Sequence, residues 1–135
     1  MKKQYKKGLR TQISKNFWST EMDCKCKDPE CKWTIIETEH IKKLQTKRNK
    51  WRKSIEITSG YRCESHNKRV GGVTNSAHRR GEATDIKVKG MAPDAVADDC
   101  ENFKGLGRYD SFTHIDSRDQ SYKSRWDFRR KKPHE

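Results

Sequence analysis

Hydrophobic residues in the middle of the chain recur with the spacing of an amphipathic helix. Between Glu39 and Lys53, successive steps of three and seven positions separate Ile41, Leu44 and Trp51, and Lys, Glu, Gln and Arg fill most of the remaining positions. An apolar stripe with this period packs on a core and leaves the opposite face of the helix in water. The sequence therefore predicts one helix over residues 39–53.

Short alternating segments predict strands. Residues 54–58 alternate polar and apolar side chains and are rich in β-branched types, and residues 83–88 form a second segment of this kind. Residues 105–109 and 112–116 predict two further strands, joined by a tight turn at Asp110 and Ser111. Pro93 is followed by acidic residues, which is typical of the first turn of a short helix.

The two ends of the chain are poor in apolar residues and rich in Lys and Arg. Hydrophobic residues make up 30% of the 135 positions and charged residues 38%, so the chain supports a single modest core. We expect a flexible basic arm at residues 1–15, one folded domain at 16–128 and a basic tail at 129–135.

The formal net charge of +13 favours a polyanionic partner. Nucleic acid, an anionic cell-wall polymer and a membrane surface are the candidates, and lysines that only keep the protein soluble are the alternative. The sequence contains no helix-turn-helix, zinc-finger or aromatic RNA-binding pattern, so nucleic acid rests on charge alone.

The basic N-terminus is not followed by the apolar run of a secretory signal. No stretch approaches the length of about 18 apolar residues that a membrane span needs. We therefore expect a monomeric protein that is made and kept in the cytoplasm.

Five cysteines are many for a chain of this size. Cys24, Cys26 and Cys31 lie in a loop rich in Lys and Asp, and Cys63 lies further along the chain. These four thiols can form a tetrahedral structural zinc site, with Cys100 left over. Because the spacing is not a paired C-x-x-C, free thiols and disulfides remain alternatives, although a reducing cytoplasm disfavours disulfides.

Two histidines and an aspartate indicate a catalytic metal site. His78 precedes Asp85 by seven positions, 85 − 78, and His114 lies on a later predicted strand. Two His and one Asp are a common ligand set for catalytic zinc, because three protein ligands leave one position open for water. These side chains can meet at one end of a sheet, and Arg62, at the exit of a strand, can reach the same cleft.

Two blocks of sequence resemble the zinc D-alanyl-D-alanine carboxypeptidases, a family that includes phage L-alanyl-D-glutamate endolysins and shares its zinc fold with the hedgehog signalling domain. The blocks are Ser59-Gly60-Tyr61-Arg62 with Ser76-x-His78-x-x-Gly81-x-Ala83-x-Asp85, and Gly105-Leu106-Gly107-x-Tyr109 with Phe112-x-His114-x-Asp116. The resemblance implies an α+β fold with a small antiparallel sheet flanked by helices. It also implies Zn²⁺ bound by His78, Asp85 and His114, and cleavage of peptide bonds in the peptidoglycan stem.

The resemblance assigns Arg62 to a substrate carboxylate or to the developing oxyanion, and Ser76 to the lining of the cleft. Many relatives carry an acidic residue three positions before the last zinc-binding His, or a His two positions before it. This chain has Ser111 and Phe112 there. Asp116 and Asp110 are the nearest carboxylates, and either is a candidate general base. Either carboxylate can instead orient His114, as carboxylates often do for metal-binding histidines, or simply pair with Arg118.

The leading hypothesis is a zinc peptidase of phage origin, released from the host cytoplasm or carried in the virion, that cuts peptidoglycan peptides. The alternative is a non-catalytic zinc-stabilised module that uses its basic surface on cell-wall polymer or nucleic acid. The retained metal ligands favour the enzyme, whereas Ser111 and Phe112 favour the module.

Overall fold

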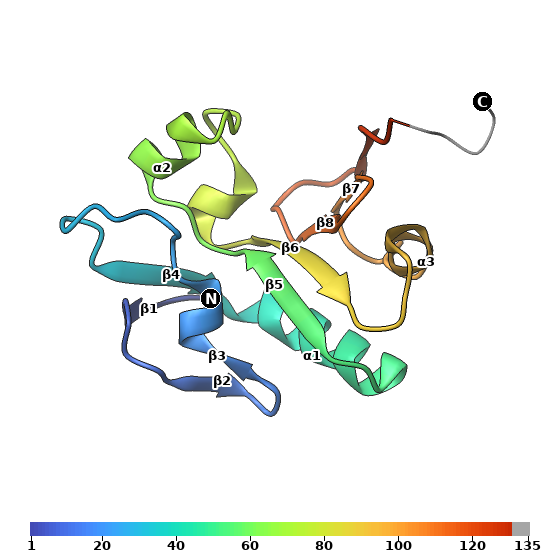
Figure 1. Ribbon diagram of the computed structural model, residues 1–135, viewed down its shortest axis with the longest axis horizontal. Coiled ribbons are helices and arrows are strands. Elements are labelled where there is room, and N and C mark those ends of the chain that lie inside the picture. The colour runs from blue at the N-terminus through green and yellow to red at the C-terminus, as the bar shows by residue number, and fades with distance from the viewer. Residues whose placement is uncertain (131–135) are drawn as a thin grey trace.

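The computed structural model describes residues 1–130 and contains a mixed α+β fold (Figure 1). In chain order the elements are β1 (Lys2–Lys6), β2 (Gln12–Ser14), β3 (Phe17–Trp18), η1 (Ser19–Met22), β4 (Trp33–Glu37), α1 (Thr38–Trp51), β5 (Ile55–Ser59), α2 (Glu64–Arg69), η2 (Ala77–Arg80), β6 (Ala83–Val88), α3 (Pro93–Asp98), β7 (Gly105–Arg108), β8 (Thr113–Asp116) and β9 (Ser124–Asp127).

The largest sheet has five strands in the order β5-β6-β8-β7-β9. The first three neighbouring pairs are antiparallel, which confirms the predicted antiparallel sheet, and β9 pairs in parallel with β7. Asp85 on β6 lies directly opposite His114 on β8 in this register. The sheet therefore places two of the predicted metal ligands side by side.

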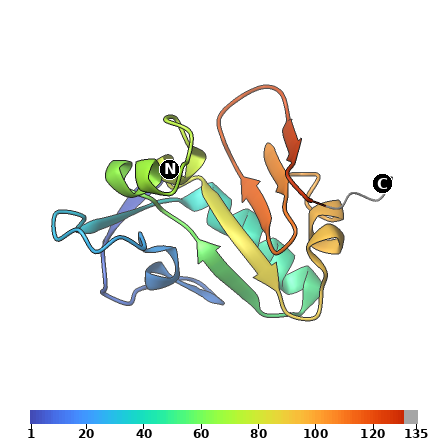
Figure 2. The same cartoon turned by 45° about the horizontal axis from the view of Figure 1, so that its top comes forward.

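The core lies between this sheet and helices α1 and α3. Leu44 of α1 and Val96 of α3 join Ile86 and Ile115 of the sheet in one buried cluster. α1 lies behind β5 and β6 in both views of the molecule (Figures 1 and 2). Side chains alternate along a strand, so Ile86 and Ile115 face the core while their neighbours Asp85 and His114 face the other way.

The predicted α1 is confirmed with small shifts at its ends. Its apolar stripe packs as expected, with Ile41 and Leu44 buried and Trp51 against the core. The helix ends at Trp51 because Arg52 adopts a left-handed backbone conformation with φ 54°, which closes the last turn.

The first residues of the chain differ from the expected flexible arm at 1–15. β1 pairs antiparallel with β4, and β2 pairs with β3 (Figure 1). β1 contains three lysines and a glutamine, so it carries no hydrophobic alternation, and Tyr5 is its side chain that packs against the core. Backbone hydrogen bonds to β4 hold this segment, and such bonds leave no signal in side-chain composition.

The expected basic tail at 129–135 lies partly outside the described residues, which end at Arg130. Arg129, the first residue of that segment, forms ion pairs with Asp94 and Asp127 and so lies against α3 and β9. Within residues 1–130, no helix is long and apolar enough to cross a bilayer.

Candidate active site

Three ligand atoms converge where η2, β6 and β8 meet. The Nε2 of His78 lies 3.3 Å from Asp85 Oδ1, and the Nδ1 of His114 lies 2.9 Å from the same oxygen. His78, Asp85 and His114 are 2%, 6% and 7% exposed. Ser76 caps η2, since its hydroxyl accepts a hydrogen bond from the backbone N–H of His78 at 3.2 Å. The predicted ligand set is therefore assembled in space.

Hydrogen bonds fix which nitrogen of each histidine faces the aspartate. His78 Nδ1 lies 2.7 Å from the carbonyl oxygen of Gly60, and a carbonyl can only accept, so Nδ1 carries the hydrogen. His114 Nε2 lies 2.7 Å from a carboxylate oxygen of Asp116 and donates to it. In neutral rings the lone pairs of His78 Nε2 and His114 Nδ1 then point at the Asp85 carboxylate.

This donor set fits a metal cation. Two ring lone pairs and a carboxylate oxygen within 4.8 Å of one another repel unless a positive charge lies between them. Two buried imidazolium ions would supply that charge only at a high desolvation cost. Two His and one Asp in this geometry match the ligand types of a catalytic Zn²⁺, with one position left for water.

When no metal is bound, a proton must take its place between the ring nitrogens and Asp85. Burial by itself raises the pKa of Asp85, but hydrogen bonds donated by His114 and His78 in that metal-free state outweigh it and hold the pKa well below its usual value. Burial by itself lowers the pKa of His114, whereas its bonds to Asp116 and Asp85 raise it above the usual value. The aspartates therefore stay ionised beside the histidines.

Asp116 lies beneath His114 and is fully buried. Besides His114 Nε2, its carboxylate accepts hydrogen bonds from Arg118 Nε at 2.8 Å and from a terminal Arg118 nitrogen at 2.7 Å. Gly105 on the neighbouring strand is in close contact, because a Cβ at Gly105 would overlap this carboxylate. Asp116 is therefore positioned to orient His114. Both of its carboxylate oxygens accept hydrogen bonds, from Arg118 and from His114.

Arg62 extends into the site from the end of β5. Its guanidinium donates to Ser59 Oγ at 3.1 Å, to Asn67 Oδ1 at 3.3 Å and to Asp85 Oδ2 at 3.4 Å. Asn67 is itself buried and donates to the backbone oxygen of Val73 at 2.8 Å. Arg62 is thus held beside His78, Asp85 and His114, in the cleft that the sequence led us to expect it to reach.

A cleft of about 510 Å³ opens above the three ligands. Polar groups at its floor include Arg62 and Ser76, and its rim carries the exposed apolar side chains of Val70, Val73 and Phe128. Tyr109 and Trp126 form one wall, with the indole N–H donating to the Tyr109 hydroxyl at 2.9 Å. The Trp126 ring lies 4.9 Å from the His114 ring, centroid to centroid.

The second candidate base, Asp110, lies away from these ligands. It is exposed at the turn before β8, its carboxylate accepts the backbone N–H of Arg130 at 3.2 Å, and it does not line the cleft. Among the described residues that line the cleft, Asp85 is the carboxylate. Phe112 does line the cleft, stacked on Tyr109, at a position where many relatives carry a histidine.

The chain matches one known protein family over most of its length. Residues 15–116 match the family model described as Peptidase M15. The chain belongs to the peptidase M15 family. A search of curated proteins finds no match. Membership of the M15 family supports a metallopeptidase, and all three ligands and Arg62 lie inside the matched segment.

Sequence reasoning missed several groups that build this M15 site. Trp126 and Asn67 had no assigned role, and Tyr109 was noted only within a motif. The glycine pattern carried a usable signal: a Cβ at Gly107 would overlap the indole of Trp126, and one at Gly72 would overlap Asn67. A glycine inside a strand often marks such a close approach.

Proposed function

We propose that this M15 protein is a zinc peptidase that hydrolyses the stem peptides of peptidoglycan, as a carboxypeptidase or an endolysin-type endopeptidase of phage origin. The observation that carries the proposal is the convergence of His78, Asp85 and His114 on the floor of a cleft that also contains Arg62. A bound zinc ion would polarise the scissile carbonyl and lower the pKa of its water toward about 7.

Arg62 binds the negative charge of the substrate in this proposal. Its guanidinium is always charged and is fixed by Ser59 and Asn67 rather than by one flexible contact. Its bond to Asp85 is long, at 3.4 Å, so the same nitrogen can turn to a substrate carboxylate or a developing oxyanion. A preorganised donor of this kind stabilises charge that appears in the transition state.

Tyr109, on the wall that it forms with Trp126, is the proposed proton donor. Trp126 donates to its oxygen, and among the described residues the phenol has no protein acceptor, so its hydrogen is available to a substrate in the cleft. Burial raises the pKa of Tyr109, which keeps the phenol protonated at neutral pH. The phenol can therefore hydrogen-bond to the oxyanion or to the leaving amine.

The alternative is a zinc-stabilised module that binds cell-wall polymer or nucleic acid without cleaving it. One observation favours it: the described cleft contains no carboxylate apart from the ligand Asp85. A very low pKa makes that ligand a poor proton acceptor. The module would use the net charge of +13 instead of the cleft.

Digestion of defined peptidoglycan fragments separates the two functions. The zinc-loaded protein is incubated with purified muropeptides, and the products are identified by mass spectrometry. We expect new termini within the stem peptide, a loss of at least about 100-fold in rate for Arg62→Ala and no cleavage for His78→Ala. His66→Ala is the matched control, because His66 lies outside the cleft. Cleavage that survives His78→Ala and exhaustive chelation would contradict the proposed peptidase.

A further inference from the structure

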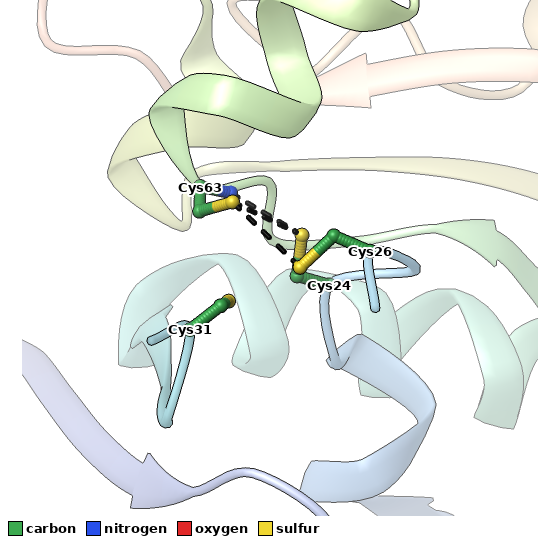
Figure 3. A group of neighbouring side chains, drawn as sticks. All are labelled: Cys24, Cys26, Cys31 and Cys63. Atoms are coloured by element: carbon green, nitrogen blue, oxygen red, sulfur yellow. Dashed lines mark hydrogen bonds between the residues drawn. The ribbon is translucent and has the colours of Figure 1, made fainter. Parts of the chain in front are cut away.

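A second cluster of metal-binding side chains lies outside the cleft. Cys24 and Cys26 follow η1, Cys31 precedes β4, and Cys63 is the residue before α2. All four side chains point toward one common volume between these segments (Figure 3). Their sulfur atoms lie within 4.8 Å of one another, and Cys24 is buried.

The sulfur spacing has the size of a metal tetrahedron. Cys63 Sγ lies 3.7 Å from Cys24 Sγ and 3.8 Å from Cys26 Sγ. A tetrahedral zinc with Zn–S bonds of about 2.3 Å separates its sulfur ligands by about 3.8 Å. A disulfide would bring two sulfurs to about 2.05 Å. The observed distances therefore fit four thiolates around one ion and do not fit a disulfide.

Hydrogen bonds around the sulfurs suit thiolates. The backbone N–H of Cys63 donates to Cys24 Sγ at 3.4 Å, and the Lys7 ammonium donates to Cys26 Sγ at 3.4 Å. Donors that surround the ligands of a metal orient them and offset their negative charge. Lys7 also binds the backbone oxygen of Cys26 at 3.1 Å, so it fixes both the ligand and its loop.

We propose that Cys24, Cys26, Cys31 and Cys63 bind a structural zinc ion. Four protein ligands close the coordination sphere, so this ion has no position for water and takes no chemical part in hydrolysis. The proposal goes beyond the peptidase function and does not depend on it.

The ion would cross-link segments that lie far apart in the sequence. The loop that carries Cys24, Cys26 and Cys31 exposes Lys25, Lys27 and Glu30 to solvent and so lacks a core of its own. Cys24 and Cys63 are separated by 39 positions, 63 − 24, so the ion closes a long loop of chain. Closing such a loop restricts the unfolded state and stabilises the fold.

The same ion would fix one side of the active site. Cys63 directly follows Arg62, whose backbone N–H donates to the His78 carbonyl at 3.1 Å. Tyr61, on the other side of Arg62, donates its backbone N–H to Met22, at the end of η1, at 2.9 Å. A metal at Cys63 thus anchors the backbone from which Arg62 extends into the cleft.

Metal analysis of a variant that lacks the catalytic ligands tests this proposal. In the His78→Ala/His114→Ala double variant, we expect about one zinc per chain, against about two in the unaltered protein. Cobalt loaded into the double variant should give intense sulfur-to-metal charge-transfer absorption. Adding Cys31→Ser should weaken cobalt binding and lower that absorption, because one of the four thiolates is lost, whereas Cys100→Ala, a cysteine outside the cluster, should leave both unchanged.

Thiol labelling gives an independent readout that needs no variant. The zinc-loaded protein is treated with iodoacetamide before and after chelation and analysed by peptide mass spectrometry. We expect the four cysteines to be protected before chelation and alkylated after it. A disulfide among them, alkylation before chelation, or a His78→Ala/His114→Ala variant that contains no zinc would overturn the proposal.

Discussion

At the scale of single residues, the site depends on which ring nitrogen of each histidine carries the hydrogen. His78 donates to Gly60 and His114 to Asp116, and these two bonds aim the opposite ring nitrogens at Asp85. The orientation exists because a carbonyl and a carboxylate accept hydrogen bonds and do not donate them. The Gly60 carbonyl and the Asp116 carboxylate therefore determine which nitrogen of each histidine faces Asp85.

Asp116→Asn should weaken zinc binding at the catalytic site by about 10- to 100-fold, because an amide orients His114 less strongly and leaves Arg118 without its charged partner. Competition with a chromophoric chelator measures this affinity. Asp119→Asn, an exposed neighbour, is the control. An unchanged affinity in Asp116→Asn would show that another group holds His114.

His40 gives the fold a dependence on acid pH. Burial lowers its pKa to about 3, against about 6.5 in an unfolded chain, and its ring bonds the hydroxyls of Ser117 and Thr84. Between these two values the unfolded chain binds the extra proton. The free energy of unfolding should therefore fall as pH drops from about 6.5 toward 3, by up to about 1.4 kcal/mol per pH unit.

Urea unfolding of the protein and of His40→Gln across this range measures the contribution. The variant should be less stable at neutral pH and should lose less stability on acidification, since glutamine does not titrate. Asp116, His114, His78 and Lys43 act on His40 through their charges and remain in both proteins. Parallel pH curves for the two proteins would contradict the assignment.

The grouping of His78, Asp85 and His114 was predictable because two imidazoles and a carboxylate are a typical ligand set for zinc, which led us to expect these three residues to meet. The geometry around Asp116 and Asp110 was not predictable, since a carboxylate has the same side chain whether it is buried under a histidine or exposed at a turn. Only the packing of Gly105 and Arg118 distinguishes the two positions.

At the scale of elements, the parallel pair of β7 and β9 builds one wall of the cleft. Gly107 lies opposite Trp126 in this register, and the absence of a side chain at Gly107 makes room for the indole. The indole in turn binds the Tyr109 hydroxyl at the end of β7. Two neighbouring strands thus position the proposed proton donor.

Gly107→Ala should displace the indole and lower the rate of hydrolysis by at least about 10-fold, with a loss of about 1–3 kcal/mol in stability from overpacking. Zinc affinity should fall less than the rate, because the hydrogen bonds that orient His78 and His114 come from Gly60 and Asp116 and not from Trp126. Steady-state kinetics and tryptophan fluorescence measure the effect, and Ser124→Ala on β9 is the control. An unchanged rate would exclude a role for this wall.

Elements with a regular apolar pattern were predicted within a few residues, and those without one were missed. α1, β5 and β6 bury alternate or periodic faces, so their sequences carry the signal. β1 and β9 have no fully buried side chain, and they form by backbone pairing at the edges of their sheets. Such pairing depends on a partner strand that is distant in the sequence, so the residues of β1 and β9 alone do not predict it.

At the scale of the whole molecule, the net charge of +13 should govern how the protein reaches an anionic surface. Binding to teichoic-acid-bearing cell walls should weaken steeply as ionic strength rises toward the physiological value. The rate on a small neutral peptide should change little over the same range. Co-sedimentation and peptide hydrolysis at matched salt concentrations measure the two effects.

Duplex DNA provides the comparison for this experiment. If the protein acts as a peptidase, added salt should weaken its binding to cell walls while the rate of peptide hydrolysis stays nearly constant. Its binding to DNA should then weaken with salt as well, because that binding is electrostatic. Tighter binding to DNA than to cell walls at physiological salt, without peptide turnover, would support the alternative module.

Three side chains that line the cleft, those of Arg118, Trp126 and Phe128, have an evolutionary consequence. The family match ends at residue 116, so these three side chains come from a stretch outside the shared pattern, while the metal ligands lie inside it. Arg118 also binds Asp116 under His114, and Trp126 binds the proposed proton donor Tyr109. Grafting residues 117–128 onto another member of the family should therefore change its rate of hydrolysis as well as its preference among peptides.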